Sequence, residues 1–272
     1  MTQLTANHTP AGTCYDVSGQ GDPLVLIHGV GLDKGMWCHQ VDALAQHFQV
    51  ITYDMLGHGS STKPADDASL NCYANQLDEL LQHLNISSCR LIGFSMGGLV
   101  ARAFALEYSA KLDALVILNS VFKRTTEQRV RVIERAQQAA EQGPDANVEE
   151  ALLRWFSDDY RAAHPEQINA IHQQLIDNDP QGYVTTYQLF ATQDCFGESQ
   201  LDQIKVPTLV VTGELDPGST PEMAEQLASR IPDAQCVILK GQRHMMPMES
   251  PDRVNQLLLE FLHSVQLGQQ AT

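Results

Sequence analysis

The stretch LIGFSMGGL at residues 91–99 decides the fold that we predict for this chain. The apolar run at 89–94 predicts a short strand, and the apolar spacing at 96–108 predicts a helix directly after it. Between them, GFSMG matches G-x-S-x-G, which places Ser95 on a sharp strand-to-helix turn with its hydroxyl exposed above the sheet edge. Glycine is needed on both sides, because a Cβ there would clash with the neighbouring strand or helix. The start of the helix also favours negative charge that develops beside Ser95.

Strands and helices alternate through most of the chain. The run LVLI at residues 24–27 is apolar throughout, as expected of a strand buried on both faces of a parallel sheet. Residues 15–19 are interpreted as the end of an earlier strand. Other apolar patterns predict strands over residues 50–54, 115–118, 208–213 and 236–239, and helices over residues 36–48, 73–84, 221–230 and 251–265. The alternation indicates βαβ units, and therefore an α/β fold whose mostly parallel central sheet is flanked by helices.

The alternation stops after Ser120. No strand is predicted from residue 122 to about 200, and this segment holds many of the aromatic residues. The predicted helices cover residues 125–142, 148–160 and 165–176, with joints at Gly143-Pro144, Pro180 and Gly182. We therefore expect a single domain, 1–272, with a helical cap inserted at about 121–200 between core parts 1–120 and 201–272. The alternative is a set of further core helices whose aromatic residues serve packing.

A nucleophilic serine needs a general base, and the base needs a third group to orient it. Asp216 lies in the stretch GELDP directly after a predicted strand, and His244 lies in GQRHM after the final strand. Since the carboxyl ends of parallel strands meet at one edge of a sheet, we predict Ser95 as nucleophile, His244 as base and Asp216 as orienting acid. Their order along the chain is the order found in α/β-hydrolases. Glu214 is the alternative acid.

Other polar residues also follow predicted strands. His28 at a strand end and His58 in a glycine-rich turn are candidates for lining the site. Asn119 stands where some α/β-hydrolases place the acid, but its amide cannot carry the charge. Four histidines on predicted helices are interpreted as solvated, namely His39, His47, His83 and His263.

The chain resembles the α/β-hydrolase superfamily over essentially its whole length. The matching motifs are HGVG at 28–31, DMLGHGSS at 54–61, GFSMGG at 93–98, GELD at 213–216, and His244 followed by PMESP at 247–251. The resemblance implies the α/β-hydrolase fold with a cap, and an oxyanion hole made by the backbone N–H groups of Val30 and Met96. A tetrahedral intermediate needs two such donors in a dry pocket. The cap length and the Met36-Trp37 region are most similar to enol-lactone hydrolases, related carbamate hydrolases and carboxylesterases.

These residues predict a serine hydrolase that cleaves a small-to-medium ester or lactone through an acyl-enzyme on Ser95. Leu56 stands where the family pattern usually has an arginine, and the cap is apolar and aromatic, so we expect short neutral esters or lactones to react best. Gly29, Trp155 and Met245 are the predicted substrate-binding residues. Cap arginines are the alternative, as ligands of a substrate carboxylate: Arg124, Arg154 and Arg161.

Three other activities remain as alternatives. One is a C–C bond hydrolase of ring-cleavage products, although Met245 stands where such enzymes commonly carry tryptophan. Another is a hydrolase-fold ligand receptor with negligible turnover. A dinucleotide-binding oxidoreductase would use Gly29, Gly31 and Gly35 with Asp54, but that spacing departs from G-x-G-x-x-G. The serine nucleophile argues against dehalogenase and epoxide hydrolase chemistry.

Composition narrows the expected partners. The 272 residues include 33 acidic and 17 basic side chains, and the formal net charge of −16 disfavours binding to nucleic acid and to anionic membranes. The first residues lack the features of a signal peptide, and no run approaches the ~18 apolar residues of a membrane span. Six scattered cysteines without a C-x-x-C pair are typical of a reducing compartment. We expect a cytoplasmic protein with a small-molecule substrate, no cofactor and no metal ion; the sequence predicts no oligomeric state.

Overall fold

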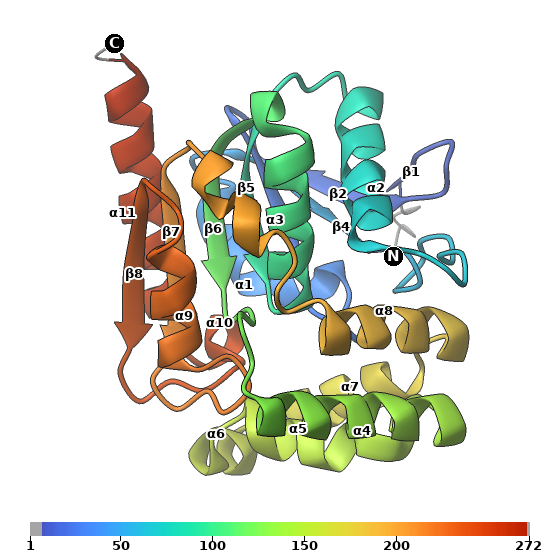
Figure 1. The fold of residues 1–272 in the computed structure, drawn as a ribbon. Coiled ribbons are helices and arrows are strands. Elements are labelled where there is room, and N and C mark those ends of the chain that lie inside the picture. The colour runs from blue at the N-terminus through green and yellow to red at the C-terminus, as the bar shows by residue number, and fades with distance from the viewer. Residues whose placement is uncertain (1–6, 271–272) are drawn as a thin grey trace.

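The computed structural model describes residues 7–270 and contains one sheet of eight strands (Figure 1). The strands are β1 (Asn7–His8), β2 (Cys14–Ser18), β3 (Pro23–Ile27), β4 (Gln49–Tyr53), β5 (Cys89–Phe94), β6 (Leu112–Leu118), β7 (Thr208–Gly213) and β8 (Ala234–Leu239). Their spatial order is β1-β2-β4-β3-β5-β6-β7-β8. The two pairings of β2 are antiparallel, and every pairing from β4 to β8 is parallel. The predicted α/β fold with a mostly parallel sheet is confirmed.

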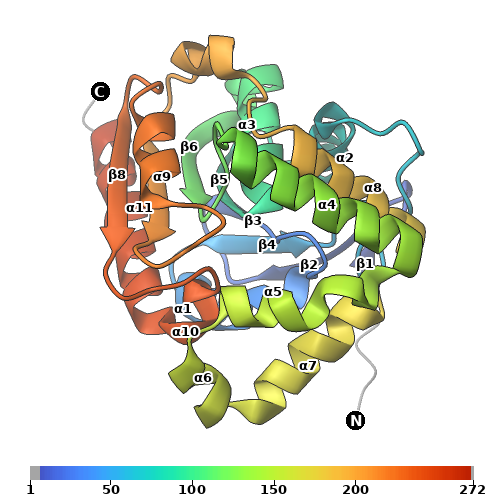
Figure 2. The ribbon, with the colours of Figure 1, turned by 60° about the horizontal axis from the view of Figure 1, so that its bottom comes forward.

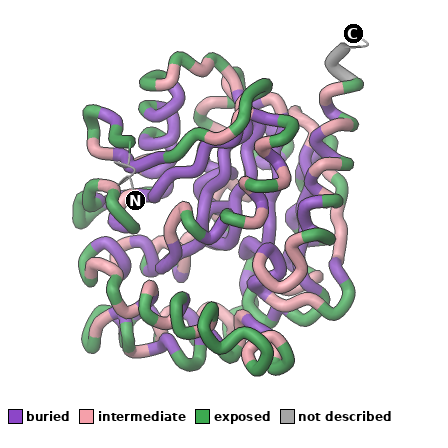
Figure 3. Tube along the Cα trace, turned by 180° about the vertical axis from the view of Figure 1, so that it is seen from behind, coloured by how far each residue is buried: buried purple, intermediate pink, exposed green. Residues whose placement is uncertain are grey.

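Helices cover both faces of the sheet. The helices on one face are α2 (Leu70–His83), α3 (Met96–Glu107) and α9 (Pro221–Ala228), and those on the other are α1 (Cys38–Leu44) and α11 (Pro251–Gln270). Within β3, Val25 and Ile27 belong to the first of these two cores, and Leu24 and Leu26 belong to the second. Figure 3 shows the strands at the centre of the molecule as buried. This double burial explains why the strand sequences are continuous apolar runs instead of alternating ones.

A separate layer of helices connects β6 to β7. It consists of α4 (Thr126–Gln142), α5 (Val148–Trp155), α6 (Asp158–Ala163), α7 (Pro165–Ile176) and α8 (Pro180–Thr192). Figures 1 and 2 show this α4–α8 layer at the end of the sheet toward which the parallel strands point. The chain between β6 and β7, all of which the structure describes, forms no strand, as predicted. The layer therefore stands over the strand ends that carry the predicted site residues.

The helix predicted over residues 148–160 is two helices in the structure. The backbone becomes extended at Phe156, which ends α5. Ser157 then begins α6, because its side chain accepts a hydrogen bond from the Tyr160 N–H at 3.2 Å. The same serine donates from its hydroxyl to Glu249 at 2.9 Å, so the break between the helices is attached to the core.

Helix α8 is absent from the sequence prediction, because Pro180 and Gly182 resemble joints. Pro180 occupies the first helical position, where the backbone N–H that proline lacks would have no acceptor within the helix. Asp179 caps the helix by accepting a hydrogen bond from the Gly182 N–H at 2.9 Å. A Cβ on Gly182 would overlap the backbone of Gly57, so this glycine allows α8 to contact the loop after β4.

Short elements complete the fold. They are 3-10 turns at Lys34–Trp37, Ser109–Lys111, Pro144–Asn147 and Glu198–Gln203, and a single helical turn, α10 (Met246–Glu249). All six cysteines are free thiols in the structure. Within residues 7–270, none of the helices has both the length and the apolar character needed to cross a membrane.

Candidate active site

Ser95 occupies a strained turn between β5 and α3. Its backbone has φ 54° and ψ −113°, a conformation that is rare for a residue with a side chain. A Cβ on Gly93 would overlap the carbonyl of Gly97, and a Cβ on Gly97 would overlap the carbonyl of Ile27. The Ser95 N–H donates to the Leu118 carbonyl at 2.9 Å, which ties the turn to β6. The two glycines of the motif are therefore needed because the backbone segments approach closely.

His244 and Asp216 lie in the loops after β8 and β7 and contact each other. The His244 Nδ1 donates to Asp216 Oδ2 at 2.7 Å, which leaves Nε2 free to act as a base. The imidazole ring is packed between Phe94, at 4.9 Å between ring centroids, and Trp155, at 5.9 Å. These two aromatic neighbours limit the movement of the ring. Through Trp155, the α4–α8 layer therefore contacts the loop that carries His244.

Of the two acids that the sequence offers, only one contacts His244. Asp216 contacts His244, whereas Glu214 is exposed and accepts a hydrogen bond from the Gly241 N–H at 2.9 Å. Among the described hydrogen bonds, none joins the Ser95 hydroxyl to His244, although both side chains line the same pocket. Such catalytic hydrogen bonds often form fully only when substrate is bound.

Asp216 is held by four hydrogen bonds. Besides His244, its carboxylate accepts bonds from the Asn119 amide at 2.9 Å and from the N–H groups of Gly218 and Ser219 at 2.9 and 3.0 Å. Burial raises the pKa of Asp216, but the neighbouring His244 and these donors lower it more, so that the pKa lies below its ordinary value. Sequence reasoning considered Asn119 only as a missing acid. Its position at the end of β6, beside β7, could have indicated a partner for Asp216.

The backbone N–H groups of Val30 and Met96 lie in the loop after β3 and at the start of α3. Outside regular helices and strands, no hydrogen bond of the described chain uses either group. Met96 is the first residue of α3, so its N–H has no acceptor within that helix. Both donors therefore remain available for a ligand.

Two buried histidines fix the loop that carries Val30. His58 Nε2 accepts the Gly31 N–H at 3.0 Å, and His28 Nε2 accepts the Met55 N–H at 2.9 Å. His28 Nδ1 donates to the Gly29 carbonyl at 2.8 Å. That carbonyl and the Val30 N–H belong to one planar peptide group, so His28 also fixes the direction of the N–H. Both histidines position the backbone, and neither is among the residues that line the pocket.

A pocket of about 590 Å³, including its opening, lies between the strand ends and the α4–α8 layer. Ser95 is only 3% exposed and opens into it, beside His244, Asp216 and Val30. The layer contributes a largely apolar wall of Ala151, Trp155, Tyr183, Tyr187 and Phe190. A mostly apolar pocket with a few polar groups suits a small molecule.

Of the three predicted substrate-binding residues, Gly29, Trp155 and Met245, one lines the pocket. Trp155 lines the pocket. Met245 is fully buried in the core, and it contacts the layer through its N–H, which donates to the Trp155 carbonyl at 3.0 Å. Gly29 is enclosed by Phe94 and Ser95 and is outside the lining. Gly29 and Met245 directly adjoin the pocket residues Val30 and His244, but a sequence neighbour need not point the same way.

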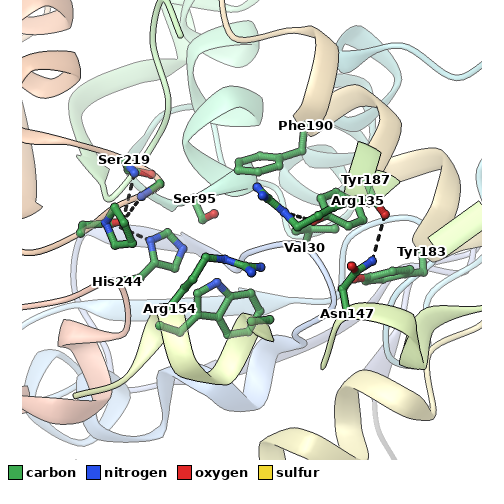
Figure 4. A pocket seen from close by; sticks show the side chains of 15 residues that line it. Val30, Ser95, Arg135, Asn147, Arg154, Tyr183, Tyr187, Phe190, Ser219 and His244 are labelled. Carbon is green, nitrogen blue, oxygen red and sulfur yellow. Dashed lines mark hydrogen bonds and ion pairs between the residues drawn. The ribbon is translucent and has the colours of Figure 1, made fainter. Parts of the chain in front are cut away.

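The cap arginines differ in surroundings. Arg124 is buried against Asp194, and Arg161 is paired with Asp158 at 2.6 Å. Arg154 and Arg135 line the pocket, as Figure 4 shows. Sequence reasoning missed Arg135, although it falls on the face of α4 that also carries the buried residues Val132, Ala136 and Ala139.

Comparison with known proteins agrees with this arrangement. Residues 22–251 match the family model described as the alpha/beta hydrolase fold. The chain belongs to the α/β-hydrolase family. This α/β hydrolase is 35% identical to an (E)-2-((N-methylformamido)methylene)succinate hydrolase of Acinetobacter baylyi, covering 96% of this chain and 97% of that protein. It is 30% identical to 3-oxoadipate enol-lactonase 1 of the same organism, over 89% of each chain. The structure of a malate-bound thermophilic esterase from Thermogutta terrifontis superposes with a TM-score of 0.85 and 32% identity, covering 96% and 97% of the chains.

In this α/β hydrolase, Asp54 has a structural role instead of the ribose-binding role that the dinucleotide alternative would give it. Its two carboxylate oxygens accept hydrogen bonds from the N–H groups of Lys34 and Ser60, each at 2.9 Å. A Cβ on Gly59 would overlap this carboxylate. Within the described chain, no three His, Cys, Asp or Glu side chains lie together as a metal site would need.

Proposed function

We propose that this α/β hydrolase cleaves a small-to-medium ester or lactone through an acyl-enzyme on Ser95. The observation that carries the proposal is that Ser95, His244 and Asp216 line one pocket and that His244 is hydrogen-bonded to Asp216, as a base with its orienting acid would be. The names of the two curated relatives, a substituted-succinate hydrolase and an enol-lactonase, support hydrolysis of an acyl or lactone bond.

The proposed reaction has two halves. The Ser95 oxygen attacks the carbonyl carbon while His244 Nε2 takes the hydroxyl proton and Asp216 stabilises the resulting imidazolium. The tetrahedral adduct then breaks the bond to the alcohol oxygen, and that oxygen takes the proton from His244. Water repeats the same steps on the acyl-enzyme, which releases the acid and restores Ser95.

Two backbone N–H groups would form the oxyanion hole for this reaction. Negative charge on the carbonyl oxygen would be bound by the N–H groups of Val30 and Met96, which have no other acceptor, and His28 and His58 would hold the first of them in place. Such preorganised donors commonly contribute most to acyl transfer. The α4–α8 layer would act as the cap that excludes water from the reacting atoms.

Covalent labelling tests the nucleophile. Wild-type protein should hydrolyse p-nitrophenyl butyrate and react with a fluorophosphonate probe, and peptide mass spectrometry should place the adduct on Ser95. Ser95→Ala should lower kcat by about 10⁴- to 10⁶-fold. Ser109→Ala, an exposed serine away from the pocket, is the matched control and should keep full activity. Labelling at another residue of active protein would contradict the assignment, and absence of ester turnover would favour the receptor alternative.

A further inference from the structure

Two guanidinium groups reach into the pocket from different helices. Arg135 comes from α4 and Arg154 from α5, and Figure 4 shows both side chains directed into the space between Ser95 and Asn147. Arg135 Nε donates to the Tyr187 hydroxyl at 3.3 Å, which steadies its side chain. The catalytic groups form one part of the pocket, and the arginines belong to the wall contributed by the α4–α8 layer.

Neither pocket arginine has a close, buried carboxylate partner. Within the part of the chain that the structure describes, Arg135 has no acidic side chain within ion-pair distance. Arg154 contacts only Glu150, at 3.5 Å, and that glutamate side chain is 72% exposed. Two other arginines of the same layer are paired closely, Arg131 with Glu127 at 2.5 Å and Arg161 with Asp158 at 2.6 Å. The pocket thus concentrates positive charge that the protein leaves largely uncompensated.

An anion bound between the two guanidinium groups would offset their mutual repulsion. Burial lowers the pKa of Arg154, and the nearby charge of Arg135 lowers it further. Carboxylates are abundant in the chain, with 33 acidic side chains against 17 basic ones. Among the residues that line the pocket, however, the only one is Asp216, which is already bound by His244, Asn119 and two backbone N–H groups. A partly buried cation normally gains an anionic partner or is replaced by a neutral residue. An anionic substrate would supply that partner.

We propose that Arg135 and Arg154 form a carboxylate subsite, and that the natural substrate is a small anionic ester or lactone with a carboxylate remote from its scissile carbonyl. This inference rests on the proposed acyl hydrolase and names its substrate class. Arginine suits the task, because its planar fork of N–H donors matches both oxygens of a carboxylate. The subsite reverses the expectation of neutral substrates, since the local charge of the pocket opposes the net charge of the chain.

A pair of matched esters tests the subsite. Mono-p-nitrophenyl adipate and p-nitrophenyl hexanoate share a leaving group and a six-carbon acyl chain, but only the first carries a terminal carboxylate. The wild-type kcat/KM should be higher for the adipate ester. Arg135→Gln and Arg154→Gln should each lower it about 10- to 100-fold, the worth of one charged hydrogen bond. The hexanoate ester should change by less than about threefold. Arg131→Gln removes one charge from the outer face of α4 and should alter neither value.

Binding without turnover separates this inference from the proposed chemistry. Titration of glutarate into Ser95→Ala protein, followed by calorimetry and by fluorescence of Trp155 in the pocket wall, should show saturable binding that Arg135→Gln and Arg154→Gln weaken. If both esters react equally well and glutarate does not bind, the carboxylate subsite is wrong while the hydrolase stands. If glutarate binds through the arginines but neither ester is cleaved, the subsite stands and the esterase chemistry is wrong.

Discussion

The buried pair His28 and His58 predicts a steep loss of stability in mild acid. Both rings accept a backbone N–H at Nε2, so both must be neutral in the folded protein. Burial lowers the pKa of His28 to about 4 and that of His58 to about 3, whereas an unfolded chain has a histidine pKa of about 6.5. Below pH 6.5 the unfolded chain therefore binds two protons that the folded protein excludes. The stabilisation is complete above pH 6.5 and is lost as the pH falls toward the folded pKa values.

The size of the effect follows from the proton count. Each histidine changes the free energy of unfolding by at most about 1.36 kcal/mol per pH unit. Between pH 6.5 and 5.0 the two together should remove about 3 kcal/mol, a large part of the ~5–15 kcal/mol that stabilises a typical protein. Urea unfolding followed by circular dichroism at half-unit pH steps measures this slope directly.

Single variants identify which residues cause this pH dependence of the unfolding free energy. His28→Asn and His58→Asn should each reduce the slope of unfolding free energy between pH 5 and 6 by about 1 kcal/mol per pH unit, whatever they do to stability at pH 8. His47→Gln, at an exposed histidine, is the control and should keep the wild-type slope. The reasoning would be refuted if both asparagine variants retained that slope. A parallel loss of kcat at pH 8 would indicate that these rings also position the Val30 N–H.

Two further predictions concern Asp216 and its neighbours. Asp216→Asn should lower kcat by about 10³- to 10⁴-fold, because an amide favours the wrong imidazole tautomer, whereas Glu214→Gln should change kcat by less than about threefold. Steady-state kinetics with p-nitrophenyl butyrate would expose a misassigned acid as the reverse pattern. Asn119→Gly keeps the positive φ of 46° but removes one donor to Asp216 and should lower kcat about tenfold with KM unchanged. An unchanged kcat would show that the other donors suffice.

The core of the fold was predictable because its signals are local. A strand buried on both faces is mostly apolar, and β3, β5 and β7 are, apart from Arg90 in β5 and the two threonines of β7. The strand ends then place polar residues at one edge, which is why Ser95, Asp216 and His244 could be selected and do lie beside one pocket. Chemical type and chain order were sufficient for these three.

Local signals failed where contacts between distant segments decide the conformation. Pro180 and Gly182 are turn residues by composition, but they form the first turn of α8, where Gly182 packs against the distant backbone of Gly57. Asn119 gained its role only because β6 and β7 are neighbours in the sheet. Neither contact is visible in a window of the sequence.

The residues that line the pocket were hardest to predict, because a few contacts between the α4–α8 layer and the core set the position of the layer's helices. The Met245 N–H binds the Trp155 carbonyl, and Ser157 binds Glu249 through both its N–H and its hydroxyl. These bonds decide which face of α5 meets His244, and so whether Arg154 points into the pocket or into solvent. The loops that carry Asp216 and His244 follow β7 and β8 directly, and the Met245 bond joins the second loop to the layer. Substitutions at the Ser157–Glu249 contact, which involves α10 instead of either loop, should consequently alter substrate choice before they alter the proposed acyl-transfer groups.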